Sequence, residues 1–256
     1  MVADRFEIVC EVEPPTRPDL MHVRHQIGVL SKVASAFLIP DNHIGRATVS
    51  SIAVAHEVEQ MGGRSIACLN ARDRNLLGFR RDLLTAAAYG VDQFLFVYGD
   101  RPTSGARTGQ LTVRSMIEEL RAFPAVSDRP FRAGVAAGPG PLPAWKRDAD
   151  FLFAQVRFSI DDMLEWRSQV DFDGPVYAGV MVVPSVGMAR KIGADIEQLA
   201  VPDAWVDAIE RDASAGVALA CDLVDAVRET GAFDGVHLVP VSKYREVAVR
   251  LEASAC

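Results

Sequence analysis

Cysteine is scarce in this sequence, which has only four, and none of them belongs to a CxxC pair. Among the histidines only His22 and His25 have helical i,i+3 spacing, and no third metal ligand is evident beside them. Scattered thiols of this kind are typical of a reduced cytosolic protein rather than of a disulfide framework or a zinc site. The sequence therefore predicts no metal, no disulfide and a cytoplasmic location.

Long basic runs and long apolar runs are also missing. The chain has 27 Lys and Arg against 34 Asp and Glu, a formal net charge of −7, which argues against nucleic acid as a partner. No stretch approaches the ~18 apolar residues of a membrane span, so no membrane association is expected. The first residues lack the basic and then apolar order of a signal peptide. The composition, 49% hydrophobic and 24% charged, is typical of a soluble globular protein.

What the sequence does contain is eight short apolar runs bounded by turn residues, with helical periodicity between most of them. Their near-continuous apolar character is typical of parallel strands covered on both faces. Eight such units favour a single (βα)8 barrel, a TIM barrel, over residues 1–256. An open doubly wound sheet is the alternative, but no GxGxxG or GxxxxGK[ST] motif follows any strand. The runs are 6–12, 34–40, 65–70, 93–99, 131–137, 151–156, 176–183 and 235–240.

Several helix boundaries can be predicted as well. Thr112 suits the N-cap of a helix, and Gly90 and Gly231 suit helix ends. One continuous helical stretch is expected from about 203 to 230, whereas the Pro-rich segment after the fifth strand is too short for a full helix. One apolar stripe expected to face the barrel consists of Leu76, Leu77, Leu83, Leu84 and Ala87.

The predicted carboxyl ends of the strands are polar, and in a (βα)8 barrel the active site lies at that end. Such convergence at one rim is hard to explain by packing. Taken singly, an aspartate after a strand also suits a helix N-cap, and Arg72 with Asp73 would suit a surface ion pair. The rim residues are Glu11, Glu13, Asp41, Asn42, His43, Asn70, Arg72, Asp73, Asp100, Arg101, Gln155, Arg157 and His237.

Glu11 is unusual because it lies inside an apolar run near the end of the first strand. Strand alternation places it on one face with Val9 and Glu13, and Cys10 and Val12 on the other. A carboxyl group directed into a barrel mouth loses hydration, which favours the neutral form that a general acid requires. The structural alternative is a rim glutamate paired with an arginine.

In their order and spacing these motifs resemble the methylenetetrahydrofolate reductase family over essentially the whole chain. The first-strand segment C-E-V-E-P-P is similar to the family's F-E-F-F-P-P and places Glu11 at its acidic position. The turns after strands 2, 3 and 4, the sixth strand and the tail also match. These segments are Asp41-Asn42, Arg72-Asp73-Arg74-Asn75 (R-D-R-N), Gly99-Asp100-Arg101-Pro102 (R-G-D-x-P), Asp150-Phe151 with Gln155 (A-D-F-x-x-x-Q) and 235–247.

The resemblance implies reduction of 5,10-methylenetetrahydrofolate to 5-methyltetrahydrofolate, a step that feeds one-carbon metabolism and methionine synthesis. It implies that Glu11 protonates the departing N10, while Asp100 and Gln155 bind the folate substrate. In the family the hydride comes from FAD that NAD(P)H has reduced. The positions that correspond to cofactor contacts are Asn42, Asn70, Arg72 and Asp100.

The sequence departs from the family mainly where the flavin would lie. Cys68 stands at a position that often holds histidine, Tyr98 replaces the arginine of R-G-D, and Gly138-Pro139-Gly140 replaces Tyr-Pro-Glu. Ala144 takes the register position of a family lysine, with Lys146 close by. These changes predict a weakened FAD site.

Three alternatives remain open at this point. FAD binds through changed contacts, or the hydride comes directly from a nicotinamide or another flavin-like carrier, or the barrel binds folate without reducing it, as a partner or regulatory subunit. The sequence also leaves open the choice between NADH and NADPH, and whether the chain forms a homo-oligomer.

Overall fold

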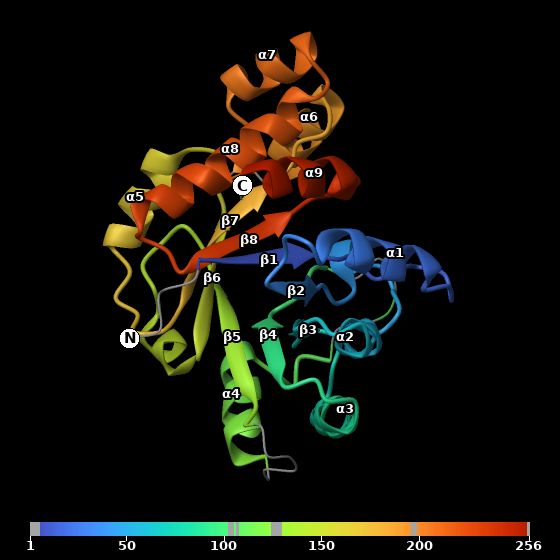
Figure 1. Cartoon of the computed structure of the whole chain (residues 1–256). Helices are drawn as coiled ribbons and strands as arrows, with labels where there is room; N and C mark the ends of the chain where they lie inside the picture. The colour runs from blue at the N-terminus through green and yellow to red at the C-terminus, as the bar shows by residue number, and fades with distance from the viewer. Residues whose placement is uncertain (1–5, 102–104, 106–107, 124–129, 196–198, 255–256) are drawn as a thin grey trace.

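Eight parallel strands close into a barrel in this computed structural model, which describes residues 6–101, 105, 108–123, 130–195 and 199–254 (Figure 1). The strands pair in chain order, and β8 pairs with β1 to close the ring. All eight predicted strands are confirmed, and with them the single (βα)8 barrel. The strands are β1 Glu7–Glu11, β2 Ala36–Ile39, β3 Ser65–Asn70, β4 Gln93–Val97, β5 Arg132–Ala137, β6 Phe151–Val156, β7 Val176–Met181 and β8 Gly235–Val239.

Helices surround the barrel, and Figure 1 shows α6, α7 and α8 standing together beyond β7. Between β5 and β6 the described chain forms only a short 3-10 turn, as the Pro-rich sequence predicts. The helices are α1 Met21–Leu30, α2 Ser51–Gln60, α3 Leu76–Ala88, α4 Val113–Ala122, α5 Ile160–Ser168, α6 Val186–Asp195, α7 Asp203–Arg211, α8 Ala215–Thr230 and α9 Tyr244–Ser254, and the 3-10 turns are η1 His43–Gly45 and η2 Ala144–Asp148.

The predicted helix boundaries are confirmed where a specific cap defines them. Thr112 begins α4 with a capping box, since its hydroxyl accepts a hydrogen bond from the Ser115 backbone while the Ser115 hydroxyl accepts one from the Thr112 backbone. Gly231 follows α8 with φ 61°, and Gly90 follows α3 with φ 74°. Both glycines have the left-handed backbone that commonly ends a helix.

The predicted continuous helix from about 203 to 230 is wrong, because α7 and α8 are separate. Between them the Asp212 carboxylate accepts hydrogen bonds from the backbone N–H and the hydroxyl of Ser214. Local side-chain bonds of this kind give the backbone an alternative to the helical ladder. The apolar periodicity does not reveal this break.

The apolar stripe predicted on α3 is also partly wrong. Leu77 and Leu84 are 79% and 55% exposed. The buried face instead runs through Phe79, Leu83 and Ala86, which follow the i, i+4, i+7 spacing of one helix face. Leu77 and Leu84 therefore point to solvent, whereas Leu76 packs partly against the core.

Alternate strand residues fill the interior of the barrel, and their neighbours pack outward against the helices. Val9 belongs to the interior cluster, whereas Cys10 and Val12 belong to the outer core, as the alternation in the first strand predicts. Phe153 stacks on Tyr177 with ring centroids 4.9 Å apart, and Phe151 meets Phe153 edge-on at 5.6 Å. These three rings, which we call the aromatic plug, fill the middle of the barrel.

One glycine is required by the aromatic plug. A Cβ atom at Gly134 on β5 would lie 2.0 Å from the ring of Phe151. The absence of a side chain at this inward position makes the space that the ring occupies. The interior is therefore packed in the middle and hollow only towards its two ends.

Candidate active site

A cleft of about 810 Å³ opens at the carboxyl ends of the strands. Its size lies within the range of roughly 300–1,000 Å³ that is usual for small-molecule sites. Polar side chains from three different strands converge on it, namely Glu11 from β1, Gln155 from β6 and His237 from β8. All three belong to the predicted rim, and Glu11 and Gln155 are the two to which the family resemblance assigns roles.

Glu11 lies at the mouth with its side chain 17% exposed, and its partner is a histidine. Its Oε2 is 3.1 Å from Nε2 of His237. The pairing of β1 with β8 sets Val9 opposite His237, which brings the two side chains together. Glu11 is thus directed inward as predicted, but it pairs with His237 and not with the arginine of the structural alternative.

Gln155 lines the same cleft, and its amide group makes no hydrogen bond to the described residues. Gly138 lies beside it, since a Cβ at Gly138 would find only Gln155 Oε1 within reach, at 4.0 Å. The turn after β5 therefore leaves open space next to Gln155.

Asp100 lies outside the described lining of the cleft but supports one of its walls. Its Oδ2 accepts a hydrogen bond from the backbone N–H of Ile44 at 2.9 Å, and Ile44 lines the cleft. Ile44 has φ 58°, a conformation that costs roughly 1–3 kcal/mol for a residue other than glycine. The Asp100 contact helps to hold that turn. The other oxygen, Oδ1, has no hydrogen bond within the described part of the chain.

A buried ion-pair network fixes the rim between β2 and β3. The Asp41 carboxylate pairs with Arg74 and accepts hydrogen bonds from the backbone and the side-chain amide of Asn70, at 2.9 and 2.7 Å. Arg74 also pairs with Asp82 at 2.8 Å. Asn70 is 1% exposed, so its described role is to join two strand ends. Its assignment to the cofactor stays a prediction.

Asn42 is likewise occupied within the loops. Its Nδ2 donates to the Asp73 carboxylate at 3.2 Å, and its Oδ1 accepts from the Thr48 backbone at 3.3 Å. Asp73 is therefore partnered by Asn42, and no ion pair with Arg72 occurs in the described residues. A cofactor contact by Asn42 also stays a prediction.

Arg72 has unused hydrogen-bonding capacity at the rim. Its guanidinium lies 4.8 Å from the ring centroid of Tyr98. Its Nε and Nη1 are buried and have no hydrogen-bond partner among the described residues. Leaving a buried donor unpaired costs about 1–3 kcal/mol, so an anionic ligand would be favoured here. Arg72 thus places a positive charge beside Tyr98, the residue that stands where the family pattern has arginine.

Cys68 points into the interior cluster of the barrel and is 5% exposed. Burial raises the pKa of its thiol well above the ordinary value, and the nearby charges of Glu11 and Asp41 raise it further. The thiol therefore stays protonated and is neither a nucleophile nor an anionic contact.

Lys146 lies near the position of the family lysine, as its place in the sequence suggests. Its Nζ donates a hydrogen bond of 2.5 Å to the carbonyl of Ala136 at the end of β5. Burial lowers the pKa of this amine. Lys146 thus places a positive charge at the rim, although Ala144 occupies the position that corresponds to the family lysine.

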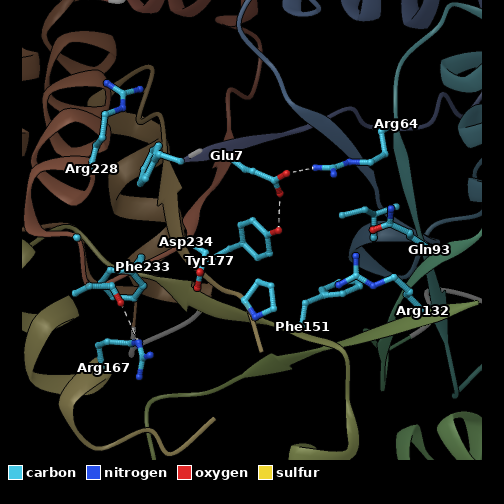
Figure 2. A pocket seen from close by; sticks show the side chains of 15 residues that line it. Glu7, Arg64, Gln93, Arg132, Phe151, Arg167, Tyr177, Arg228, Phe233 and Asp234 are labelled. Carbon is cyan, nitrogen blue, oxygen red and sulfur yellow. Dashed lines mark hydrogen bonds and ion pairs between the residues drawn. The ribbon is translucent and has the colours of Figure 1, made fainter. Parts of the chain in front are cut away.

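A second cavity, of about 500 Å³, lies at the opposite, amino-terminal end of the barrel (Figure 2). Figure 2 shows Glu7 joined on one side to Arg64 and on the other to Tyr177, each at 2.6 Å. Burial and the Glu7 carboxylate raise the pKa of the Tyr177 phenol, which keeps it a hydrogen-bond donor. Residues at this end of such barrels commonly serve stability.

Removing the Tyr177 hydroxyl is therefore expected to affect stability rather than catalysis. Tyr177→Phe leaves one Glu7 oxygen without its donor, and we expect a loss of about 1–3 kcal/mol in the free energy of unfolding. Urea denaturation measures this, with Tyr89→Phe, on an exposed ring, as control. An unchanged unfolding midpoint for Tyr177→Phe would mean that water replaces the hydroxyl without cost.

Within the described residues, no group of three or more His, Cys, Asp and Glu side chains is placed to hold a metal ion. None of the described helices has the length and apolar character needed to cross a membrane.

The family assignment rests on a sequence match over nearly the whole chain. The family model described as methylenetetrahydrofolate reductase matches residues 3–253. The chain belongs to the methylenetetrahydrofolate reductase family. No curated protein sequence matches it. Membership in this family supports a folate-related function for the cleft.

Solved structures agree with the fold. An uncharacterized protein from Clostridium thermocellum, which binds two copies of 5-methyl-5,6,7,8-tetrahydrofolic acid, is similar with a TM-score of 0.66 and 12% identity over 98% of this chain and 95% of that chain. Tryptophan synthase from Mycobacterium tuberculosis gives a TM-score of 0.54 and 13% identity over 98% and 92%. At such low identity these likenesses establish the barrel architecture alone.

Proposed function

We propose that this member of the methylenetetrahydrofolate reductase family reduces 5,10-methylenetetrahydrofolate to 5-methyltetrahydrofolate, with NAD(P)H as the source of the hydride. The observation that carries the proposal is the largely buried carboxyl group of Glu11, directed into the cleft at the active-site end of the barrel. The folate bound by the C. thermocellum protein is the product of this same reaction, which is consistent with the proposal.

In the proposed reaction Glu11 protonates N10 as the five-membered ring of the substrate opens to an iminium ion. Gln155, whose amide makes no hydrogen bond to the described residues, would orient the pterin by hydrogen bonds. Asp100 would contribute Oδ1, which accepts no hydrogen bond from the described residues, from the neighbouring wall.

The described residues at the positions that would face a flavin ring offer it no charged contact, which favours a nicotinamide as the bound hydride donor. A bound nicotinamide would supply the hydride that the methylene carbon receives. Arg72, whose Nε and Nη1 are buried and have no hydrogen-bond partner among the described residues, suits an anionic phosphate group of such a donor. Cys68 is buried in the barrel interior and Gly138 leaves open space, so neither gives an isoalloxazine a charged contact. We therefore propose weakened FAD binding and direct use of NAD(P)H.

The proposal is tested by mixing the purified protein with 5,10-methylenetetrahydrofolate and either NADH or NADPH, with and without added FAD. The expected result is formation of 5-methyltetrahydrofolate with one nicotinamide and no need for FAD. Tight folate binding without any turnover, with or without FAD, would overturn the proposal in favour of a folate-binding partner subunit.

Loss of pterin contacts is expected to weaken substrate binding. Gln155→Ala and Asp100→Asn should each raise the folate dissociation constant by about fivefold, since one hydrogen bond contributes ~1 kcal/mol and 1.4 kcal/mol is tenfold. Titration calorimetry measures the affinities, with Gln169→Ala at the end of α5 as control. Normal folate binding by both variants would place the substrate pocket elsewhere.

A further inference from the structure

Glu11 has a partner that the proposed reaction leaves without a role. We propose that His237 is the positioning residue that holds the Glu11 carboxyl group and supplies the proton that Glu11 passes to the substrate. This inference rests on the proposed function and adds a second residue to it. The two side chains come from the first and the last strands of the barrel.

The geometry restricts His237 to this contact. Its side chain is 13% exposed, and its Nε2 lies 3.1 Å from Glu11 Oε2. Phe153 meets the imidazole ring edge-on, with ring centroids 5.3 Å apart. On the adjoining strand β7 the residue in register is Gly179. The ring therefore has an apolar wall on one side and the carboxyl group of Glu11 at its Nε2.

The proposed proton transfer is balanced by one solvent proton in each turnover. The Nε2–H bond of the imidazolium breaks and an O–H bond forms on the Glu11 carboxylate. That O–H bond then breaks as the departing N10 gains its proton. The ring, now neutral and still carrying its Nδ1 proton, recovers a proton at Nε2 from water once product release reopens the cleft. A histidine suits this task because it gains and loses a proton near neutral pH.

The other titratable groups near the pair are less suited to the task. The Cys68 thiol on β3 faces Glu11, but burial raises its pKa too far for it to supply a proton. On β6 and β7 the neighbours of His237 are Phe153 and Gly179, which do not titrate. Among the described residues that line the cleft without a hydrogen bond to Glu11 are Glu13, His22, His43 and Arg46.

Two substitutions separate proton supply from support of the fold. His237→Ala is expected to lower kcat by about 10–100-fold while the KM for folate changes by less than about threefold. Added imidazole should restore much of the lost rate, and the rescue should depend on the acidity of the imidazolium used. His237→Gln fills the site, cannot carry a proton, and should lose the same rate without rescue. His56→Ala on α2 is the matched control and should keep wild-type kinetics.

The outcomes distinguish this inference from the proposed function. If Glu11→Gln is inactive while His237→Gln keeps wild-type kcat and an unchanged pH–rate profile, only the inference about His237 is overturned. If Glu11→Gln is fully active, Glu11 leaves the mechanism and the inference about His237 falls with it. The proposed function itself fails only if the wild-type protein forms no 5-methyltetrahydrofolate.

A spectroscopic readout does not depend on activity. The imidazole ¹⁵N signals of His237 should shift in Glu11→Gln and stay in place in Glu57→Gln, a matched change on α2. Signals that do not respond to Glu11→Gln would overturn the contact and the inference with it.

Discussion

Replacing Glu11 with glutamine is expected to lower kcat for methylenetetrahydrofolate reduction by about 10²–10⁴-fold, the usual contribution of a positioned general acid. Glutamine keeps the volume of the side chain and can still accept a hydrogen bond from His237, but it has no proton of suitable acidity to give to N10. The protein should therefore fold normally and bind folate with nearly unchanged affinity.

Steady-state rates and folate titrations on the same preparation measure these effects. Glu57→Gln, on α2 outside the cleft, provides the matched control, because its carboxylate pairs with Arg24 on α1. More than about a tenth of the wild-type kcat remaining in Glu11→Gln would remove Glu11 from the mechanism. Equal losses of folate affinity and rate would instead make it a binding residue.

The second large effect concerns FAD. Protein purified without added flavin is expected to be colourless, because several polar contacts worth ~1 kcal/mol each are missing and every 1.4 kcal/mol weakens binding tenfold. Cys68 offers a buried neutral thiol, Tyr98 replaces a cation and Gly138 has no side chain. Affinity for FAD should therefore be lower by orders of magnitude than a complete set of contacts would give.

The visible spectrum after dialysis, and the rate with and without excess FAD, test this directly. A deuterium label on the reduced nicotinamide should appear in the methyl group of the product, since the hydride passes without an intermediate carrier. Stoichiometric FAD that survives dialysis and is required for turnover would restore the flavin mechanism. The fold and the proposed role of Glu11 are compatible with either result.

The barrel could be predicted from the sequence because its determinants are local. Each strand is one apolar run between turn residues, and each run is too apolar to leave either face in water. The orientation of Glu11 follows from alternation along β1 alone, with Val9 inside and Cys10 outside. Boundaries set by Thr112 and Gly231 are equally local, since each depends on one side chain or on its absence.

The contacts that complete the site could not be predicted because they join distant parts of the chain. Glu11 and His237 are 226 residues apart, and only the register between the first and last strands brings them together. The hydrogen bond from the Ile44 backbone to Asp100 requires Ile44 to adopt a left-handed backbone conformation. A β-branched residue rarely adopts that conformation, so the sequence does not indicate it. The sequence indicates only that His237 is the one polar residue in the apolar run of β8, which places it at the rim but does not identify Glu11 as its partner.

The aromatic plug formed by Phe151, Phe153 and Tyr177 determines how molecules can reach the site. The aromatic plug separates the cleft, which Phe153 lines, from the cavity at the amino-terminal end, which Phe151 and Tyr177 line. In the proposed reaction folate and the nicotinamide therefore enter through the same opening of the cleft. The molecule that binds deeper in the cleft must bind first and dissociate last. We therefore expect the two substrates to bind in a fixed order, and product-inhibition kinetics would measure that order.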